Sequence, residues 1–194
     1  MSADKFLLHK EFSGPLDFKG FKAAQRKYLQ LVDDNAYSPT RTKNIYELIQ
    51  EIKRAPKEIG PYVKISVFEA LNRIGSDLVL LSGSEQLFER KVQGIIPRTI
   101  HLKMGNTRGF DFEVTLQDGT VIYGEAFNAA ESFCKEKMRQ AIEKVIKKNE
   151  DPRARKAIIM VNDDVREIIE DYNNKLEKAN QSQFEILKVY CKVL

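Results

Sequence analysis

The sequence GFDFEVTLQDGTVIYGEAFN, at residues 109–128, predicts two antiparallel strands joined by a tight turn. Residues 110–117 alternate between apolar and polar side chains, which is the period of a strand with one buried face. Asp118 and Gly119 then reverse the chain, and residues 121–127 are β-branched and aromatic, as in a second strand. Glu125 lies inside that second strand among apolar neighbours, so its carboxylate needs a partner.

The length of the turn determines which residue lies opposite Glu125. With a two-residue loop at residues 118–119, Phe112 lies opposite Glu125, and Asp111 and Glu125 point to opposite faces of the sheet. With a three-residue loop beginning at Gln117, Asp111 lies opposite Glu125, and their Cβ atoms are about 4.5 to 5.5 Å apart. The sequence favours the three-residue loop only mildly, because Asp-Gly occurs in both. The three-residue loop also allows the two carboxylates to share a divalent cation.

Length and composition predict one domain, at most two, with a substantial core. The chain has 194 residues, of which 42% are hydrophobic. Residues 1–10 do not resemble a signal peptide, and no run approaches 18 apolar residues, so we expect a cytoplasmic protein with no membrane partner. Cys134 and Cys191 lie in apolar patterns without a neighbouring Cys or His cluster, which indicates buried free thiols and argues against a zinc site.

Helical spacing of apolar residues predicts five helices. They cover residues 16–32, 44–54, 66–81, 84–92 and 128–145. Ser66 and Glu69 form a capping box at the start of the third helix, and Gly83 separates the third helix from the fourth. A sixth helix begins at Asp163 or Asp164 and continues to about residue 179.

Three further segments complete the predicted sheet. After Pro97 the apolar period changes to two, so residues 98–104 form a strand. The short apolar run KAIIMV at residues 156–161 is typical of a strand covered on both faces and reached through a crossover helix. Residues 184–194 alternate weakly and predict an edge strand.

These elements predict an α/β fold with a mixed central sheet flanked by helices. Three antiparallel strands come first, and a parallel strand follows the crossover helix. The predicted domain boundary separates an N-terminal helical segment, residues 1–65, from an α/β core, residues 66–194.

The order helix, three antiparallel strands, helix, parallel strand resembles the core of the PD-(D/E)xK nucleases, which have the restriction-endonuclease-like fold. The resemblance covers about residues 66–161, and the matching residues are Asp111 on the second strand and Glu125 on the third. It implies a site for Mg²⁺, or alternatively Mn²⁺, in which Asp111 and Glu125 ligate the metal through oxygen. The chain departs from the family pattern at Phe127, where the family has a lysine two residues after the glutamate.

A lysine from another position is expected to replace the missing one, because the signature lysine stabilises charge near the attacking water. Lys103, on the polar face of the first strand, is the first candidate. Lys135, on the helix after the third strand, is the second candidate. Its alternative is an ordinary surface lysine paired with Glu131, four residues earlier.

Two other polar residues are predicted to share the face of Asp111. Glu113 is a candidate for an additional catalytic acid, with a solvent-facing strand residue as the alternative. His101 is a more distant candidate for activating water, although a lone histidine is more often structural or exposed.

Charge and resemblance together predict a partner that is a nucleic acid. Residues 135–156 contain nine Lys or Arg against four acids, and a nuclease needs cations for phosphates beside carboxylates for the metal. The net charge of +4 permits a polyanionic partner without arguing for one. The resemblance implies a Mg²⁺-dependent endonuclease that hydrolyses DNA phosphodiester bonds, of the restriction or defence type. It also implies duplex DNA as substrate and a homodimer, since two strands require two sites.

Two alternatives remain open. One is a nucleic-acid-binding or assembly module on the same fold whose catalysis has lapsed, for which Phe127 argues. The other is an unrelated α/β protein in which the acids are incidental. No helix-turn-helix, zinc-finger or RNA-binding signature is present, so the sequence does not distinguish DNA from RNA.

Overall fold

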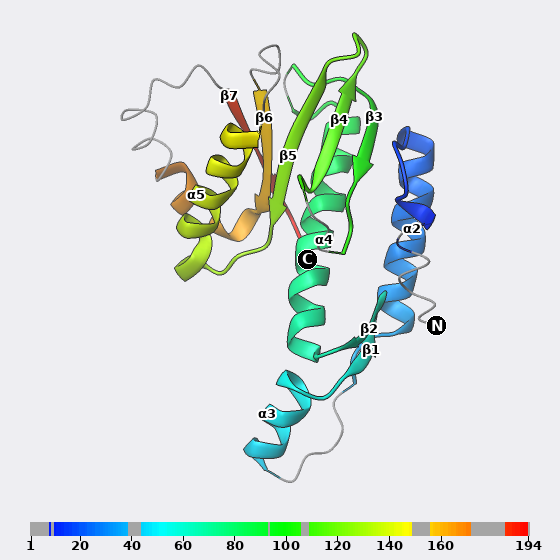
Figure 1. The fold of residues 1–194 in the computed structure, drawn as a ribbon, viewed down its shortest axis with the longest axis vertical. Helices are drawn as coiled ribbons and strands as arrows, with labels where there is room; N and C mark the ends of the chain where they lie inside the picture. Colours follow the sequence, from blue (N-terminus) through cyan, green and yellow to red (C-terminus); the bar gives the residue numbers. More distant parts are fainter. Residues whose placement is uncertain are drawn as a thin grey trace.

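The computed structural model describes residues 8, 10–38, 44–92, 94–105, 109–148, 156–171 and 185–193, which have an α/β fold (Figure 1). Five strands form one mixed sheet in the order β3-β4-β5-β6-β7. Their bounds are β3 (Pro97–Leu102), β4 (Phe112–Leu116), β5 (Val121–Phe127), β6 (Lys156–Asn162) and β7 (Glu185–Cys191). The pairs β3·β4 and β4·β5 are antiparallel, whereas β5·β6 and β6·β7 are parallel. The predicted mixed sheet is therefore confirmed, and so is the edge position of the last strand.

Helices cover both faces of the sheet. The long helices are α2 (Phe18–Asp34), α3 (Ile45–Lys53), α4 (Val67–Phe88) and α5 (Glu131–Lys148). Ile158 and Met160 of β6 pack in one hydrophobic cluster with side chains of α2 and α4. The intervening Ile159 and Val161 pack on the other face with side chains of α5. Because side chains alternate along a strand, this arrangement explains why β6 is apolar throughout.

The hairpin between β4 and β5 has the three-residue loop. Leu116 N–H donates to the Thr120 carbonyl at 2.9 Å, and Gly119 has the left-handed φ of +84° that this turn needs. In the strands, Phe112 pairs with Gly124. The loop is therefore residues 117–119, and the three-residue alternative is confirmed. The regular pairing ends at Phe112, and Asp111 N–H donates to the Gly124 carbonyl, so Asp111 and Glu125 do not form a regular cross-strand pair.

The predicted break at Gly83 is wrong, because α4 runs without interruption from Val67 to Phe88. A Cβ atom at Gly83 would lie only 2.7 Å from Met160 Cγ and 3.1 Å from Cys191 Sγ. The glycine therefore allows the helix to approach β6 and β7 closely. Its cost to helix stability, roughly 1 kcal/mol relative to alanine, is offset by that packing. The predicted helix start is confirmed, because Glu69 N–H donates to Ser66 Oγ at 3.2 Å.

Residues 57–65, at the end of the predicted N-terminal helical segment, contain two strands that were not predicted. Strands β1 (Lys57–Ile59) and β2 (Tyr62–Ile65) form a separate antiparallel hairpin, joined by Gly60 and Pro61. The hydrophobic core also crosses the predicted boundary. Phe21 and Tyr28 of α2 belong to the same buried cluster as Ile100 of β3.

The predicted sixth helix lies only partly within the described residues. Asp163–Val165 is a 3₁₀ turn that continues as a helix to residue 171, and the rest of the predicted sixth helix lies outside the described residues. Cys134 and Cys191 are buried and free, as predicted. None of the helices in the described part of the chain is both long and apolar enough to cross a bilayer.

Candidate functional site

A cleft of about 500 Å³ lies between α4, α5 and the C-terminal end of β5. One wall consists of side chains of α4 between residues 69 and 80. The opposite wall consists of side chains of α5 between residues 137 and 144, and Glu125, Ala126 and Phe127 line the cleft from β5. Lys103 and Asp111 line it from the segments that flank the β3–β4 connection. The cleft thus combines residues that are up to about 80 positions apart in the sequence.

The two acids predicted from the hairpin both line this cleft. Glu125 is only 7% exposed and lies on the face of β5 that α5 covers. Asp111 lies immediately before β4, where the ladder becomes irregular, and its N–H donates to the Gly124 carbonyl at 3.1 Å. Its Oδ2 accepts a hydrogen bond from Ala126 N–H at 2.9 Å. The Asp111 side chain thus takes the place of a backbone acceptor and is fixed beside Glu125.

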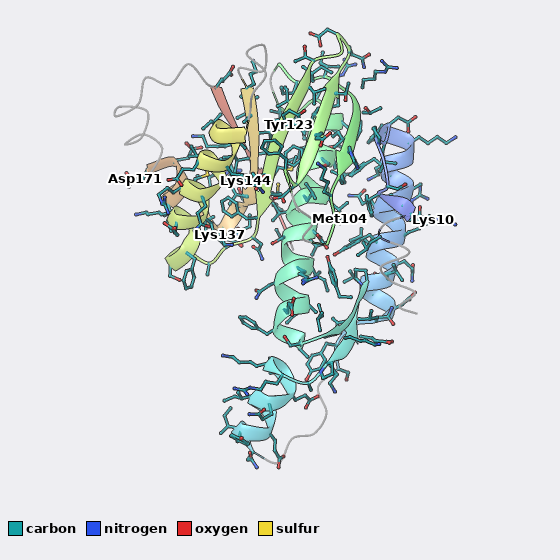
Figure 2. The ribbon with its side chains drawn as sticks, in the orientation of Figure 1. Lys10, Met104, Tyr123, Lys137, Lys144 and Asp171 are labelled. Carbon is teal, nitrogen blue, oxygen red and sulfur yellow. The ribbon has the colours of Figure 1, made fainter. Side chains whose placement is uncertain are left out.

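The cation nearest to these acids comes from α5. The Lys144 ammonium group donates to Glu125 Oε2 and forms an ion pair with it. Lys137, two turns earlier on the same helix, also lines the cleft, and Figure 2 labels both lysines. Lys137, Gln140 and Lys144 follow helical spacing, so one side of α5 presents them all to the cleft.

The pKa of Asp111 is raised above its ordinary value. Burial is the largest cause, because it disfavours the charged carboxylate. The hydrogen bond from Ala126 N–H and the charges of Lys144, Lys103 and Lys137 act in the opposite direction. Desolvation, and not repulsion between carboxylates, is therefore the main cause of the raised pKa.

The other predicted residues have different positions. Lys103 lines the cleft, its N–H donates to the Asp111 carbonyl at 2.8 Å, and its ammonium group lies 2.6 Å from Glu113 Oε1. Glu113 is thus engaged by Lys103 and is not among the residues that line the cleft. His101 lies opposite Glu113 on β3 and does not line the cleft either. Lys135 is exposed on α5, away from the lining.

Sequence reasoning missed Lys144 and Lys137. It named Lys103 as the first candidate and Lys135 as the second candidate for the missing cation. The feature of the sequence that could have identified Lys137 and Lys144 is the buried stripe of α5, which includes Cys134, Met138, Ala141 and Val145. Lys137 and Lys144 each directly precede a member of that stripe, so they lie at its border and can reach the sheet.

A second buried acidic cluster, in which Asp77 is bound by Tyr28 and Tyr62, was also missed, and Asp77 lines the cleft. Asp77 of α4 is only 6% exposed and accepts hydrogen bonds from the hydroxyls of Tyr28, at 2.7 Å, and Tyr62. Burial raises the pKa of Asp77 to about 6, while the two phenols, the backbone N–H of Gly105 and the charge of Arg73 lower it. Such a satisfied buried carboxyl ties α4 to α2 and β2.

Among the described residues, no group of three or more His, Cys, Asp or Glu side chains is placed to hold a metal ion. Asp111 and Glu125 nevertheless fit Mg²⁺ or Mn²⁺ chemically. Mg²⁺ is commonly held by one or two carboxylates, with water and substrate phosphates completing its shell. Two hard oxygen ligands on one wall of an open cleft suit that arrangement.

Comparison of the chain with protein-family models, with curated proteins and with solved structures gives no match. The function must therefore be inferred from the residues of the cleft.

Proposed function

We propose that this protein is a metal-dependent endonuclease that hydrolyses DNA phosphodiester bonds with a PD-(D/E)xK arrangement of residues. The observation that carries the proposal is the convergence of Asp111, Glu125 and Lys144 in one cleft. The order of α4, β3, β4, β5, α5 and β6 also follows the order of elements in the core of that family. In this proposal the enzyme is of the restriction or defence type, and two copies each supply one cleft to a duplex.

Lys144 replaces the signature lysine in this proposal. Phe127, at the position of that lysine, packs in the hydrophobic cluster with Cys134 and Met138 of α5. Lys144 reaches Glu125 from the helix that covers the same face of β5. A cation therefore stands beside the carboxylates although it comes from a different backbone position, and transition-state stabilisation requires only that the charge be placed correctly.

Four residues of the cleft have defined roles in the proposed reaction. Asp111 and Glu125 would hold the divalent ion, which supplies Lewis-acid stabilisation of the phosphoryl oxygens when bound. Ala126 N–H orients the Asp111 carboxylate through its hydrogen bond to Oδ2. The Lys144 ammonium group donates to the oxygen on which negative charge develops as water attacks phosphorus.

A binding module without catalysis is the second candidate, and the contact between Lys144 and Glu125 also favours it. An ion pair inside the protein neutralises Glu125 without a metal. In such a module the cleft would still hold phosphates, but Asp111 and Glu125 would not ligate an ion.

A cleavage assay tests the proposal. The purified protein is incubated with supercoiled plasmid and with duplex or single-stranded oligonucleotides of DNA and RNA, in Mg²⁺, Mn²⁺ or EDTA. We expect DNA cleavage that is lost in EDTA and in Glu125→Gln, because that change removes the ligand charge and keeps the side-chain shape. Lys135→Ala is the matched control on α5 and should cut as the wild type does. No cleavage in either metal, or equal cleavage by Glu125→Gln, would overturn the proposal.

A further inference from the structure

We propose that Arg73 of α4 and Lys137 of α5 form a two-sided phosphate clamp at the rim of the cleft, which holds the backbone of a nucleic-acid strand over Asp111 and Glu125. The inference rests on the proposed function for its ligand class. Both residues line the cleft, and they come from the two helices that cover opposite faces of the sheet.

Arg73 is held in place before any ligand binds. Its guanidinium Nη2 lies 2.5 Å from Glu69 Oε1, and the group lies over the ring of Tyr62 at 5.5 Å from the centroid. Tyr62 is itself fixed by its hydrogen bond to the buried Asp77. The Arg73 side chain remains 30% exposed, so donors of the guanidinium fork are left for a phosphate. Glu69 also lines the cleft, and its ion pair with Arg73 is an exposed one within a single helix. Exposed pairs of this kind contribute little energy, so the contact orients Arg73 without binding it tightly.

Lys137 provides the opposite side of the clamp. It is exposed on the wall formed by α5, and it makes no ion pair with any residue in the described part of the chain. It lines the same cleft as Asp111 and Glu125, and its charge acts to lower the pKa of the Asp111 carboxyl. Arg139, on the same helix, differs because it is bound to Glu136 and Glu143 and does not line the cleft.

The distribution of charge inside the cleft identifies the ligand class. Lys103 and Lys144 are each engaged by a carboxylate at the sheet, Glu113 and Glu125 respectively. Lys137 has no ion pair within the described residues, and Arg73 has only its exposed partner Glu69; both line the cleft from its helices. Cations on the helices beside acids on the sheet suit a phosphodiester, whose charged oxygens contact the helices while phosphorus approaches Asp111 and Glu125. Such contacts fix a strand through its backbone and do not read its bases.

The salt dependence of binding tests the clamp independently of cleavage. Fluorescence anisotropy in EDTA measures the affinity for a labelled 20-mer duplex and for one of its single strands between 50 and 300 mM salt. Arg73→Gln and Lys137→Gln should each reduce the slope of log affinity against log salt by about 0.9 for the duplex or about 0.7 for the single strand. The same reduction is expected for an oligonucleotide of unrelated sequence. Lys135→Gln is the matched control on α5, outside the cleft, and should leave the slope unchanged.

The outcomes separate the clamp from the proposed activity. The clamp is overturned if the wild type binds neither oligonucleotide, if Arg73→Gln and Lys137→Gln keep the wild-type slope, or if Lys135→Gln reduces the slope equally. Reduced slopes in a protein that does not cut plasmid would support the clamp and refute the endonuclease. Cleavage of plasmid by a protein whose Arg73→Gln and Lys137→Gln variants keep the wild-type slope would support the endonuclease and refute the clamp. Both substituted side chains are at least partly exposed, and circular dichroism melts verify that the variants fold.

Discussion

Two buried acidic clusters share the cleft, and the protein satisfies them in different ways. Asp77 accepts from the phenols of Tyr28 and Tyr62, which are neutral donors on α2 and β2. Asp111 and Glu125 lie beside Ala126 N–H and the ammonium group of Lys144. The first cluster joins three elements through hydrogen bonds, whereas the second contains an ion pair with one long, half-buried side chain.

The exposure of the hydrogen-bond donors indicates which of the two clusters can exchange its donor for another group. The phenols of Tyr28 and Tyr62 are almost fully buried, so nothing can replace them without opening the core. The Lys144 side chain is 30% exposed, so another cation can compete for Glu125. In the proposed function, Asp77 therefore belongs to the architecture of the cleft, and Asp111 and Glu125 carry its chemistry.

The largest expected difference between the two clusters is the effect of a substitution on metal affinity. Asp111→Asn should lower the affinity for Mn²⁺ or Mg²⁺ by about 100-fold and cleavage by about three orders of magnitude, because a charged oxygen ligand is lost. Asp77→Asn is the matched change at the other cluster and should leave metal affinity within about twofold of the wild type. Isothermal titration calorimetry measures both. Equal affinity in the wild type and Asp111→Asn would argue against a metal at this site.

The second largest expected effect is on kcat, when the lysine that pairs with Glu125 or the one that pairs with Glu113 is replaced. Lys144→Ala should lower kcat by about two to three orders of magnitude with KM little changed, as the loss of one transition-state donor does. Lys103→Ala, which removes the cleft lysine engaged by Glu113, should lower kcat less than about tenfold. Steady-state cleavage of an oligonucleotide compares the two. If Lys103→Ala is inactive while Lys144→Ala cuts normally, Lys103 supplies the catalytic cation, as the sequence first suggested.

The smallest expected effect is the change with pH in the free energy of unfolding, and it concerns Asp77. The pKa of Asp77 is raised from 3.8 to about 6 in the folded protein, so between these pH values the folded state binds more protons than the unfolded state. The free energy of unfolding that Asp77 contributes therefore falls as pH rises from about 4 to 6, by up to about 3 kcal/mol, and is constant above. Asp77→Asn does not titrate and should lack this fall.

Urea unfolding, followed by circular dichroism at pH 4, 5, 6 and 7, measures the difference between wild type and Asp77→Asn. Other titrating groups are common to both proteins and cancel in that difference. A difference in the free energy of unfolding that is the same at all four pH values would show that Asp77 does not titrate in this range.

Local features of the sequence were sufficient for the central hairpin and its acids. The alternation at residues 110–117 and the Asp-Gly turn are short-range patterns. They predicted the hairpin and mildly favoured the three-residue loop, which the structure has. The capping box at Ser66 and the parallel strand at residues 156–161 were found for the same reason. Strand period, caps and turns depend on neighbouring residues, so they can be read from the chain alone.

Contacts between distant residues were decided only by the tertiary structure. Lys144 is 19 positions from Glu125, and Tyr28 is 49 positions from Asp77. Each contact depends on how a helix is rotated and how closely it packs against its neighbours, which no local pattern specifies. Gly83 shows the same limit, because an apparent helix break is in fact the place where α4 touches β6 and β7. The position of the acids follows from strand pairing within one hairpin, whereas the position of the cation follows from helix packing across the whole fold.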